Sequence, residues 1–118
     1  MMIKIPVSVG ELLDKISILE IKSMFTDDEY VLKELEQLTL IKSTLTQYTL
    51  SQEVKLKKVN EKLWKIEDKL RKLEEEQKFD EEFIELARSV YKINDERARI
   101  KKEINELCNS EYREVKLY

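Results

Sequence analysis

Apolar residues recur at steps of three and four along two long stretches in the second half of the chain, on either side of a short polar break. This spacing puts them on one side of an α-helix, in the pattern of a heptad repeat. If the chain reverses at the break, the two apolar seams face each other in a single register. The pattern therefore predicts an antiparallel coiled-coil hairpin. Its seam residues are Leu56, Val59, Leu63, Ile66, Leu70 and Leu73, then Phe83, Leu86, Val90, Ile93, Ile100, Ile104 and Leu107.

Charged residues beside the two seams agree with the same register. Lys62 would lie opposite Glu96, and Lys55 would lie opposite Glu103, each as a pair of unlike charges. Flanking charges of this kind set the partner and the orientation in coiled coils. We therefore expect both ion pairs along the hairpin.

The first half of the chain predicts two shorter helices. Ser8 with Glu11, and Thr26 with Glu29, have the spacing of a capping box, in which two side chains satisfy free backbone N–H groups at the start of a helix. Apolar residues follow each box at helical spacing. The two helices are predicted over 9–24 and 27–48.

These elements predict an all-α fold of four helices in one domain, 1–118. The two long helices form the coiled-coil hairpin, and the two shorter helices pack on one side of it. At the chain ends, Ile3 to Val7 and Glu114 to Tyr118 alternate apolar and polar residues. Alternation is typical of extended structure, so we expect short extended segments that could pair with each other.

A second stripe beside each seam mixes aromatic, small and charged residues. In an antiparallel hairpin both stripes lie on the same side, and we expect them to face the two shorter helices. Breaking a buried charge pair costs about 3 to 5 kcal/mol, so a polar network between the layers is predicted. The candidate ligand-binding residues in this layer are Trp64, Glu67, Arg71, Tyr91, Asn94, Arg97 and Lys101.

Two interpretations of this polar layer remain open. In the first, its polar groups are structural and fix the register and order of the helices. In the second, Arg71, Lys101 and nearby carboxylates form a small pocket for a polar or anionic ligand. Arg97 occupies the one seam position that is not apolar, and we expect it to reach out of the seam towards Glu61 or Asn60.

Composition excludes several classes of protein. With 22 basic and 25 acidic residues interleaved, and a net charge of -3, the chain has no broad positive face, so nucleic-acid binding is not expected. No apolar run is long enough for a membrane span or a secretion signal. The only cysteine, Cys108, has no partner for a disulfide, and we expect a small buried side chain in a reducing compartment. The expected location is the cytoplasm.

Residues with catalytic potential are scarce. The chain has no histidine, no second cysteine and one glycine, Gly10, which excludes the common zinc sites, the serine and cysteine triads and a glycine-rich phosphate loop. Glu11 with Asp14, and Glu82 with Glu85, have a spacing that could serve Mg²⁺, but such pairs arise freely in so acidic a chain. We predict no catalytic residue, no metal site and no cofactor.

Four segments carry a resemblance to a known family: Pro6 to Lys15, Leu63 to Asp68, Phe83 to Tyr91 and Asn94 to Ala98. In these segments the chain resembles domain-of-unknown-function family 6165, a group of small bacterial and phage proteins. The resemblance covers nearly the whole chain. It implies a self-standing protein of bacterial or phage origin, and it assigns no activity and no functional residue.

Two functions from different classes follow. The first is a non-enzymatic interaction or scaffold protein that self-associates as a dimer or binds a protein partner, because a thin layer of four helices leaves apolar residues such as Leu32, Leu40 and Ile41 exposed. The alternative is a small binding protein or Mg-dependent enzyme that acts on a phosphorylated or nucleotide ligand.

Overall fold

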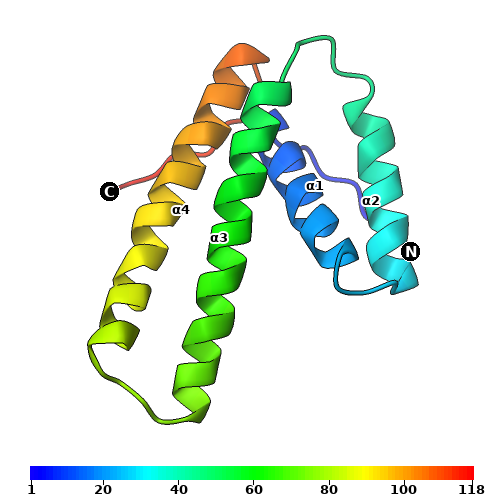
Figure 1. Ribbon diagram of the computed structural model, residues 1–118. Helices are drawn as coiled ribbons and strands as arrows, with labels where there is room; N and C mark the ends of the chain where they lie inside the picture. Colours follow the sequence, from blue (N-terminus) through cyan, green and yellow to red (C-terminus); the bar gives the residue numbers. More distant parts are fainter.

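The computed structural model describes all residues from 1 to 118, and the fold is all-α with four helices and no strand, as predicted. The helices are α1 (Val9–Ser23), α2 (Glu29–Lys42), α3 (Leu50–Glu75) and α4 (Glu81–Leu107). The two long helices, α3 and α4, form an antiparallel hairpin, α1 lies against it, and α2 lies beyond α1 (Figure 1). The terminal segments do not pair as strands. None of the helices combines the length and apolar character needed to cross a membrane.

Helix starts follow local capping chemistry. The Ser8 hydroxyl accepts from the backbone N–H of Glu11 at 3.1 Å, and α4 is capped by Asp80, as predicted. The predicted start of α2 is wrong by two residues. Asp28 is the N-cap and Thr26 only supports it from outside the helix, because an ionised Asp both accepts backbone hydrogen bonds and favours the positive end of the helix dipole.

Both α2 and α3 end earlier than the sequence predicts. α2 ends at Lys42 instead of near Tyr48, and just beyond this end the hydroxyls of Ser43 and Thr44 each donate to a backbone carbonyl three residues earlier. α3 ends three residues before the predicted end at Lys78. There Gln77 adopts a left-handed conformation, with φ of 55°, and closes the helix.

α1 is the central element of the core. It contacts each of the other three helices, whereas α2 packs on α1 and reaches the hairpin through the ion pair of Lys42 with Glu53 at 2.9 Å. No residue of α2 is fully buried, although Leu35 and Leu38 lie half-buried against the core. The buried residues of the main core cluster are Leu12, Leu13 and Ile16 of α1, Leu56, Val59 and Leu63 of α3, and Ile100 and Ile104 of α4.

The hairpin is covered over only part of its length. At 1.5 Å per residue, α1 is about 22 Å long and α3 about 39 Å. Seam residues beside α1, such as Leu56 and Val59, are buried, whereas Ile66 and Leu70 further along α3 are half-buried. The end of the hairpin near the α3–α4 turn therefore extends beyond α1 (Figure 1).

The predicted flanking ion pairs are wrong. Lys62 does not pair with Glu96, and Glu103 accepts from Gln52 at 3.2 Å instead of pairing with Lys55. Exposed ion pairs contribute little free energy, so flexible surface side chains take whichever partner is within reach.

Candidate functional site

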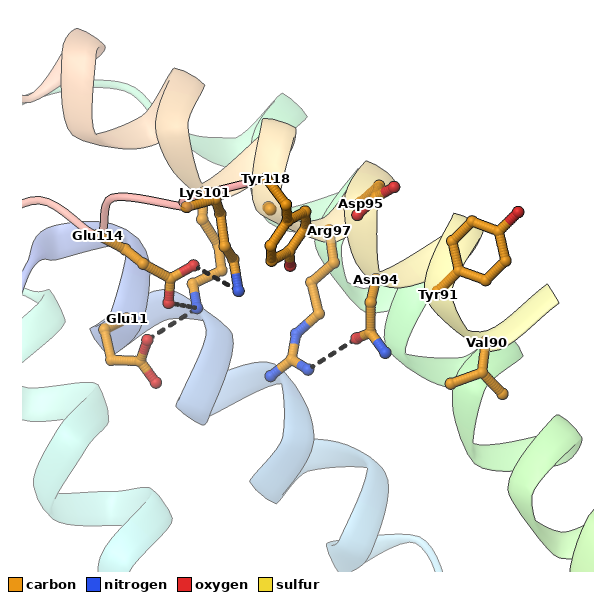
Figure 2. Close-up of a pocket in the computed structure, with 11 residues that line it drawn as sticks. Glu11, Val90, Tyr91, Asn94, Asp95, Arg97, Lys101, Glu114 and Tyr118 are labelled. Carbon is orange, nitrogen blue, oxygen red and sulfur yellow. Dashed lines mark hydrogen bonds and ion pairs between the residues drawn. The ribbon is translucent and has the colours of Figure 1, made fainter. Parts of the chain in front are cut away.

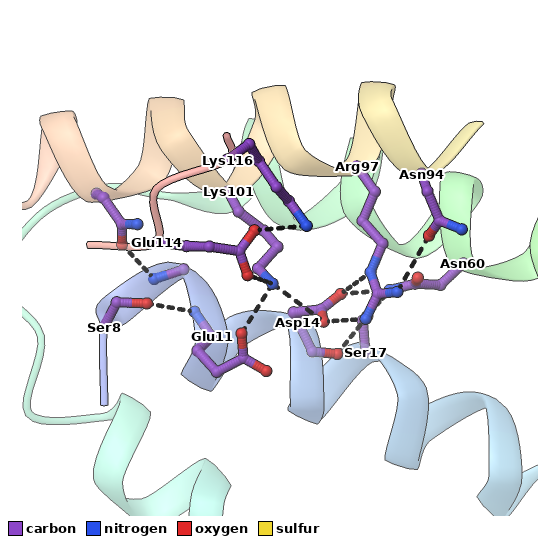
Figure 3. Close-up of polar contacts among 12 residues, drawn as sticks. Ser8, Glu11, Asp14, Ser17, Asn60, Asn94, Arg97, Lys101, Glu114 and Lys116 are labelled. Atoms are coloured by element: carbon purple, nitrogen blue, oxygen red, sulfur yellow. Dashed lines mark hydrogen bonds and ion pairs between the residues drawn. The ribbon is translucent and has the colours of Figure 1, made fainter. Parts of the chain in front are cut away.

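The most deeply buried charge of the molecule is the carboxylate of Asp14, which is 1% exposed. α1 carries it between core leucines and Ile16 and directs it at the hairpin (Figure 3). Arg97 of α4 donates to both carboxylate oxygens, through Nε to Oδ1 at 2.9 Å and through Nη2 to Oδ2. Asn60 of α3 donates from Nδ2 to Oδ1 at 2.9 Å. One carboxylate thus joins three helices through charge-assisted hydrogen bonds.

Further polar residues extend the hydrogen-bond network around this carboxylate. Ser17, one turn along α1, accepts from Asn60 at 2.6 Å and donates to the backbone carbonyl of Asp14 at 2.8 Å. Nη1 of Arg97 donates to Asn94 at 3.4 Å. The hydrogen bond with Asp14 raises the pKa of Arg97, although partial burial of the guanidinium opposes that shift. The arginine therefore stays charged throughout the pH range of proteins.

Lys101 extends the network towards the C-terminus. It is buried, and its Nζ lies 2.8 Å from Glu11, 3.8 Å from Asp14 and 3.7 Å from Glu114. Glu114 belongs to the segment after α4, which turns back along that helix (Figure 3). A hydrogen bond with Lys116, at 3.1 Å, is the main cause that lowers the pKa of Glu114, and the positive charge of Lys101 adds to it.

The start of α1 is fixed to the end of α4 by hydrogen bonds to its free backbone N–H groups. Gly10 N–H donates to Asn105 Oδ1 at 2.7 Å, and Val9 N–H donates to Ser110 Oγ at 3.1 Å. The absence of a side chain at Gly10 permits this approach, because a Cβ there would lie 2.7 Å from the backbone oxygen of Lys101. These backbone N–H groups at the start of α1 therefore find their hydrogen-bond acceptors within the protein.

A hollow of about 770 Å³ opens beside the network, between α1, α4 and the C-terminal segment (Figure 2). Arg97, Lys101, Glu114, Tyr91 and Tyr118 are among the residues that line it. Each basic group of the network, including Lys116, lies against a carboxylate. The wall therefore offers no uncompensated positive charge to an anion. No group of three or more His, Cys, Asp or Glu residues is arranged to hold a metal ion.

Comparison with known proteins places the chain in a family. The model of a family of unknown function, DUF6165, matches residues 3–118. The chain belongs to this family. No curated protein and no solved structure matches it. The expected resemblance is thus confirmed, and family membership leaves the function of this DUF6165 protein to be argued from its geometry.

The structure divides the predicted site residues into two groups. Asn94, Arg97 and Lys101 join the network around Asp14. Trp64 is half-buried at the end of α1, where its ring stacks on Phe25 with centroids 5.5 Å apart and planes at 7°.

The expected burial of Glu67, Arg71 and Tyr91 under the shorter helices is wrong, because all three are exposed. Glu67 and Arg71 lie 4.0 Å apart and pair with each other across one turn of α3. The physical reason is length, since α1 ends beside Trp64 and cannot reach them. Glu67 and Arg71 therefore do not belong to a site with Arg97 and Lys101, whereas exposed Tyr91 lines the hollow beside those two basic residues.

Sequence reasoning missed the centre of the network. Arg97 binds Asp14, not the predicted Glu61 or Asn60, because α1 lies over this part of the seam. Asp14 was considered only as half of a metal-ligand spacing with Glu11. The sequence does contain a signal for this pair. An acidic residue within the apolar face of one helix and a basic residue within the apolar seam of another each interrupt an apolar pattern, and each needs a partner of opposite charge when buried.

Proposed function

We propose that this DUF6165 protein is a non-enzymatic interaction protein that self-associates as a dimer in the cytoplasm. The observation that carries the proposal is the large accessible surface area of the single chain. Its accessible area is 8852 Å², whereas a compact monomer of 14.2 kDa exposes about 6,800 Å². Its radius of gyration is 16.1 Å, against about 13.5 Å for a compact chain of this length.

The excess area of about 2,000 Å² is the scale of a protein interface, because a standard complex covers about 800 Å² on each partner and obligate homodimers cover more. Large apolar side chains are among the groups exposed, including Ile84 and Tyr91 on α4 and Leu40 and Ile41 on α2. Where exposed apolar side chains form a contiguous patch, they mark association sites.

The polar network supports a structural role over a catalytic one. Its carboxylates and basic groups neutralise one another and link α1 to the hairpin. Burial raises the pKa of the Cys108 thiol, which keeps it protonated and weakly nucleophilic at neutral pH. The free cysteine also supports the reducing environment of the cytoplasm.

Sedimentation equilibrium from micromolar concentration upwards tests the proposal. We expect a species of twice the 14.2 kDa chain mass, in equilibrium with monomer at the lowest concentrations. A protein that remains strictly monomeric across the concentration range would refute self-association.

The volume of the hollow, about 770 Å³, favours a second candidate, a binding protein for a phosphorylated or nucleotide ligand, in which the ligand would displace carboxylates from Arg97 and Lys101. A thermal-shift screen with nucleotides, sugar phosphates and Mg²⁺ distinguishes the two functions. A ligand at 100 times its dissociation constant stabilises a protein by about 2.7 kcal/mol. Under the leading proposal none of these compounds shifts the melting temperature. A shift that disappears in Lys101→Met would favour the second candidate.

A further inference from the structure

The hairpin carries an uncovered stripe that we name the distal face. It consists of Glu67 and Arg71 on α3 and Ile84, Ala87 and Tyr91 on α4, and it begins beyond Trp64, whose ring is covered by Phe25. On both helices it continues the stripe through which the hairpin contacts α1, because Asn60 on α3 and Asn94 on α4 belong to the same helical rows. The two parts of the stripe differ in that α1 covers the first part and not the distal face, because α1 ends beside Trp64.

The α4 half of the distal face is apolar and open. Ile84 is 54% exposed and Tyr91 is 56% exposed. Ala87 lies between them and is also exposed, so another helix could approach closely there. Under this stripe the seam residues Leu70 and Val90 are only half-buried, whereas Leu73 nearer the turn is buried. Two helices alone leave a seam in this state, and a further pair of helices closes it into a four-helix bundle.

The α3 half of the distal face carries one acid and one base, one turn apart. Glu67 is 55% exposed and Arg71 is 79% exposed, and their mutual distance of 4.0 Å makes only a weak ion pair. In a two-fold symmetric contact the same patch meets itself. Glu67 of each copy can then face Arg71 of the other, which makes the patch self-complementary in charge. A second copy of this chain fits that pattern.

We infer that two copies dock through their distal faces about a two-fold axis, so that the two hairpins form a four-helix bundle beyond the ends of α1. This inference rests on the proposed self-association and adds its location. The excess surface of the single chain, about 2,000 Å² with its exposed chain ends included, leaves room for the roughly 800 Å² that each partner contributes to a standard interface.

A pair of matched double variants tests the location. Ile84→Glu with Tyr91→Glu places charge on the distal face, and Leu40→Glu with Ile41→Glu places the same charge on exposed apolar positions of α2. All four positions are exposed in the single chain, so helical content by circular dichroism should stay unchanged. In sedimentation equilibrium we expect the distal variant to be monomeric and the α2 variant to remain a dimer.

Charge reversal tests the two-fold arrangement separately. Glu67→Arg alone brings like charges together and should raise the dimer dissociation constant about tenfold or more. Adding Arg71→Glu in the same chain restores unlike charges across the axis, so affinity should return to near the wild-type value. Failure of the second change to restore affinity overturns the two-fold pairing of these residues.

The outcomes separate the two claims. If the wild-type chain is monomeric, the proposed function itself fails. If the wild-type chain is a dimer and the distal variant still dimerises, or if both variants are monomeric, self-association stands and the distal face is overturned as its specific location. A monomeric distal variant beside a dimeric α2 variant supports the inference.

Discussion

At the scale of single residues, the ion pair between Asp14 and Arg97 is asymmetric. Asp14 is buried, whereas the Arg97 side chain remains 26% exposed and its guanidinium lies towards the hollow. If Asp14 is neutralised, Arg97 can keep part of its hydration. If Arg97 is removed, a buried carboxylate remains with only Asn60 and the more distant Lys101 as partners. The two changes should therefore differ in their effect.

We expect Arg97→Met to lower the free energy of unfolding by about 3 to 5 kcal/mol, because it leaves a buried charge without its main partner. Asp14→Asn should lower it less, by about 1 to 3 kcal/mol. Urea denaturation measures both. Arg88→Met on the exposed side of α4 is the matched control and should change stability by less than about 0.5 kcal/mol. Equal losses for Arg97→Met and Arg88→Met would contradict the assigned role.

Gly10 gives a second prediction at this scale. Alanine favours a helix over glycine by about 0.8 to 1.0 kcal/mol, so propensity alone predicts that Gly10→Ala stabilises α1. The added Cβ would lie 2.7 Å from the backbone oxygen of Lys101 and 3.0 Å from Asn105. Overpacking of this kind costs about 1 to 3 kcal/mol, so we expect a net loss in urea denaturation. A variant more stable than wild type would show that α1 can move away without cost.

At the scale of the elements, the hairpin should be unevenly stable along its length. Leu56→Ala removes a side chain that is completely buried under α1 and should lower the free energy of unfolding by about 2 to 5 kcal/mol. Leu70→Ala removes a half-buried side chain from the same seam, so its loss should be clearly smaller. Urea denaturation at low protein concentration makes the comparison. Equal losses would mean that the seam is covered equally along the hairpin.

The C-terminal segment should detach from α4 in acid. Its contact with Lys101 depends on ionised Glu114, whose pKa is lowered mainly by the hydrogen bond with Lys116 of the same segment and further by the charge of Lys101 on α4. Only the contribution of Lys101 is linked to docking. A lowered pKa in the folded state stabilises docking above the unfolded value and loses that effect as pH falls through the folded value. We therefore expect release as the pH falls below the ordinary pKa of a glutamate, about 4.3.

The chemical shifts of Tyr118 followed by NMR across this pH range measure that release. Glu114→Gln provides the control, because it should leave the segment released already at neutral pH and without an acid transition. The same transition in wild type and in Glu114→Gln would assign it to another carboxylate.

At the scale of the whole molecule, the fold could be predicted where the decisive interactions are local. Heptad spacing determines the hairpin, and side chains within one turn determine the caps at Ser8 and Asp80. The burial of the distal face could not be predicted correctly, because it depends on where α1 ends relative to α3. The partner of Arg97 was missed for a related reason, since Asp14 lies 83 residues away and on a different helix.

The separation of α1 from its partners along the chain has a consequence during synthesis. Its polar contacts on α4 and beyond lie 83 to 101 residues further on. Ribosomes add about 5 to 20 residues per second, so α1 is made roughly 4 to 17 seconds before Arg97 exists. During that interval Asp14 must remain hydrated, and the leucines beside it have no hairpin to cover them. A nascent chain that stalls before α4 is complete therefore exposes the face of its first helix that packs on α4, the kind of surface that chaperones bind.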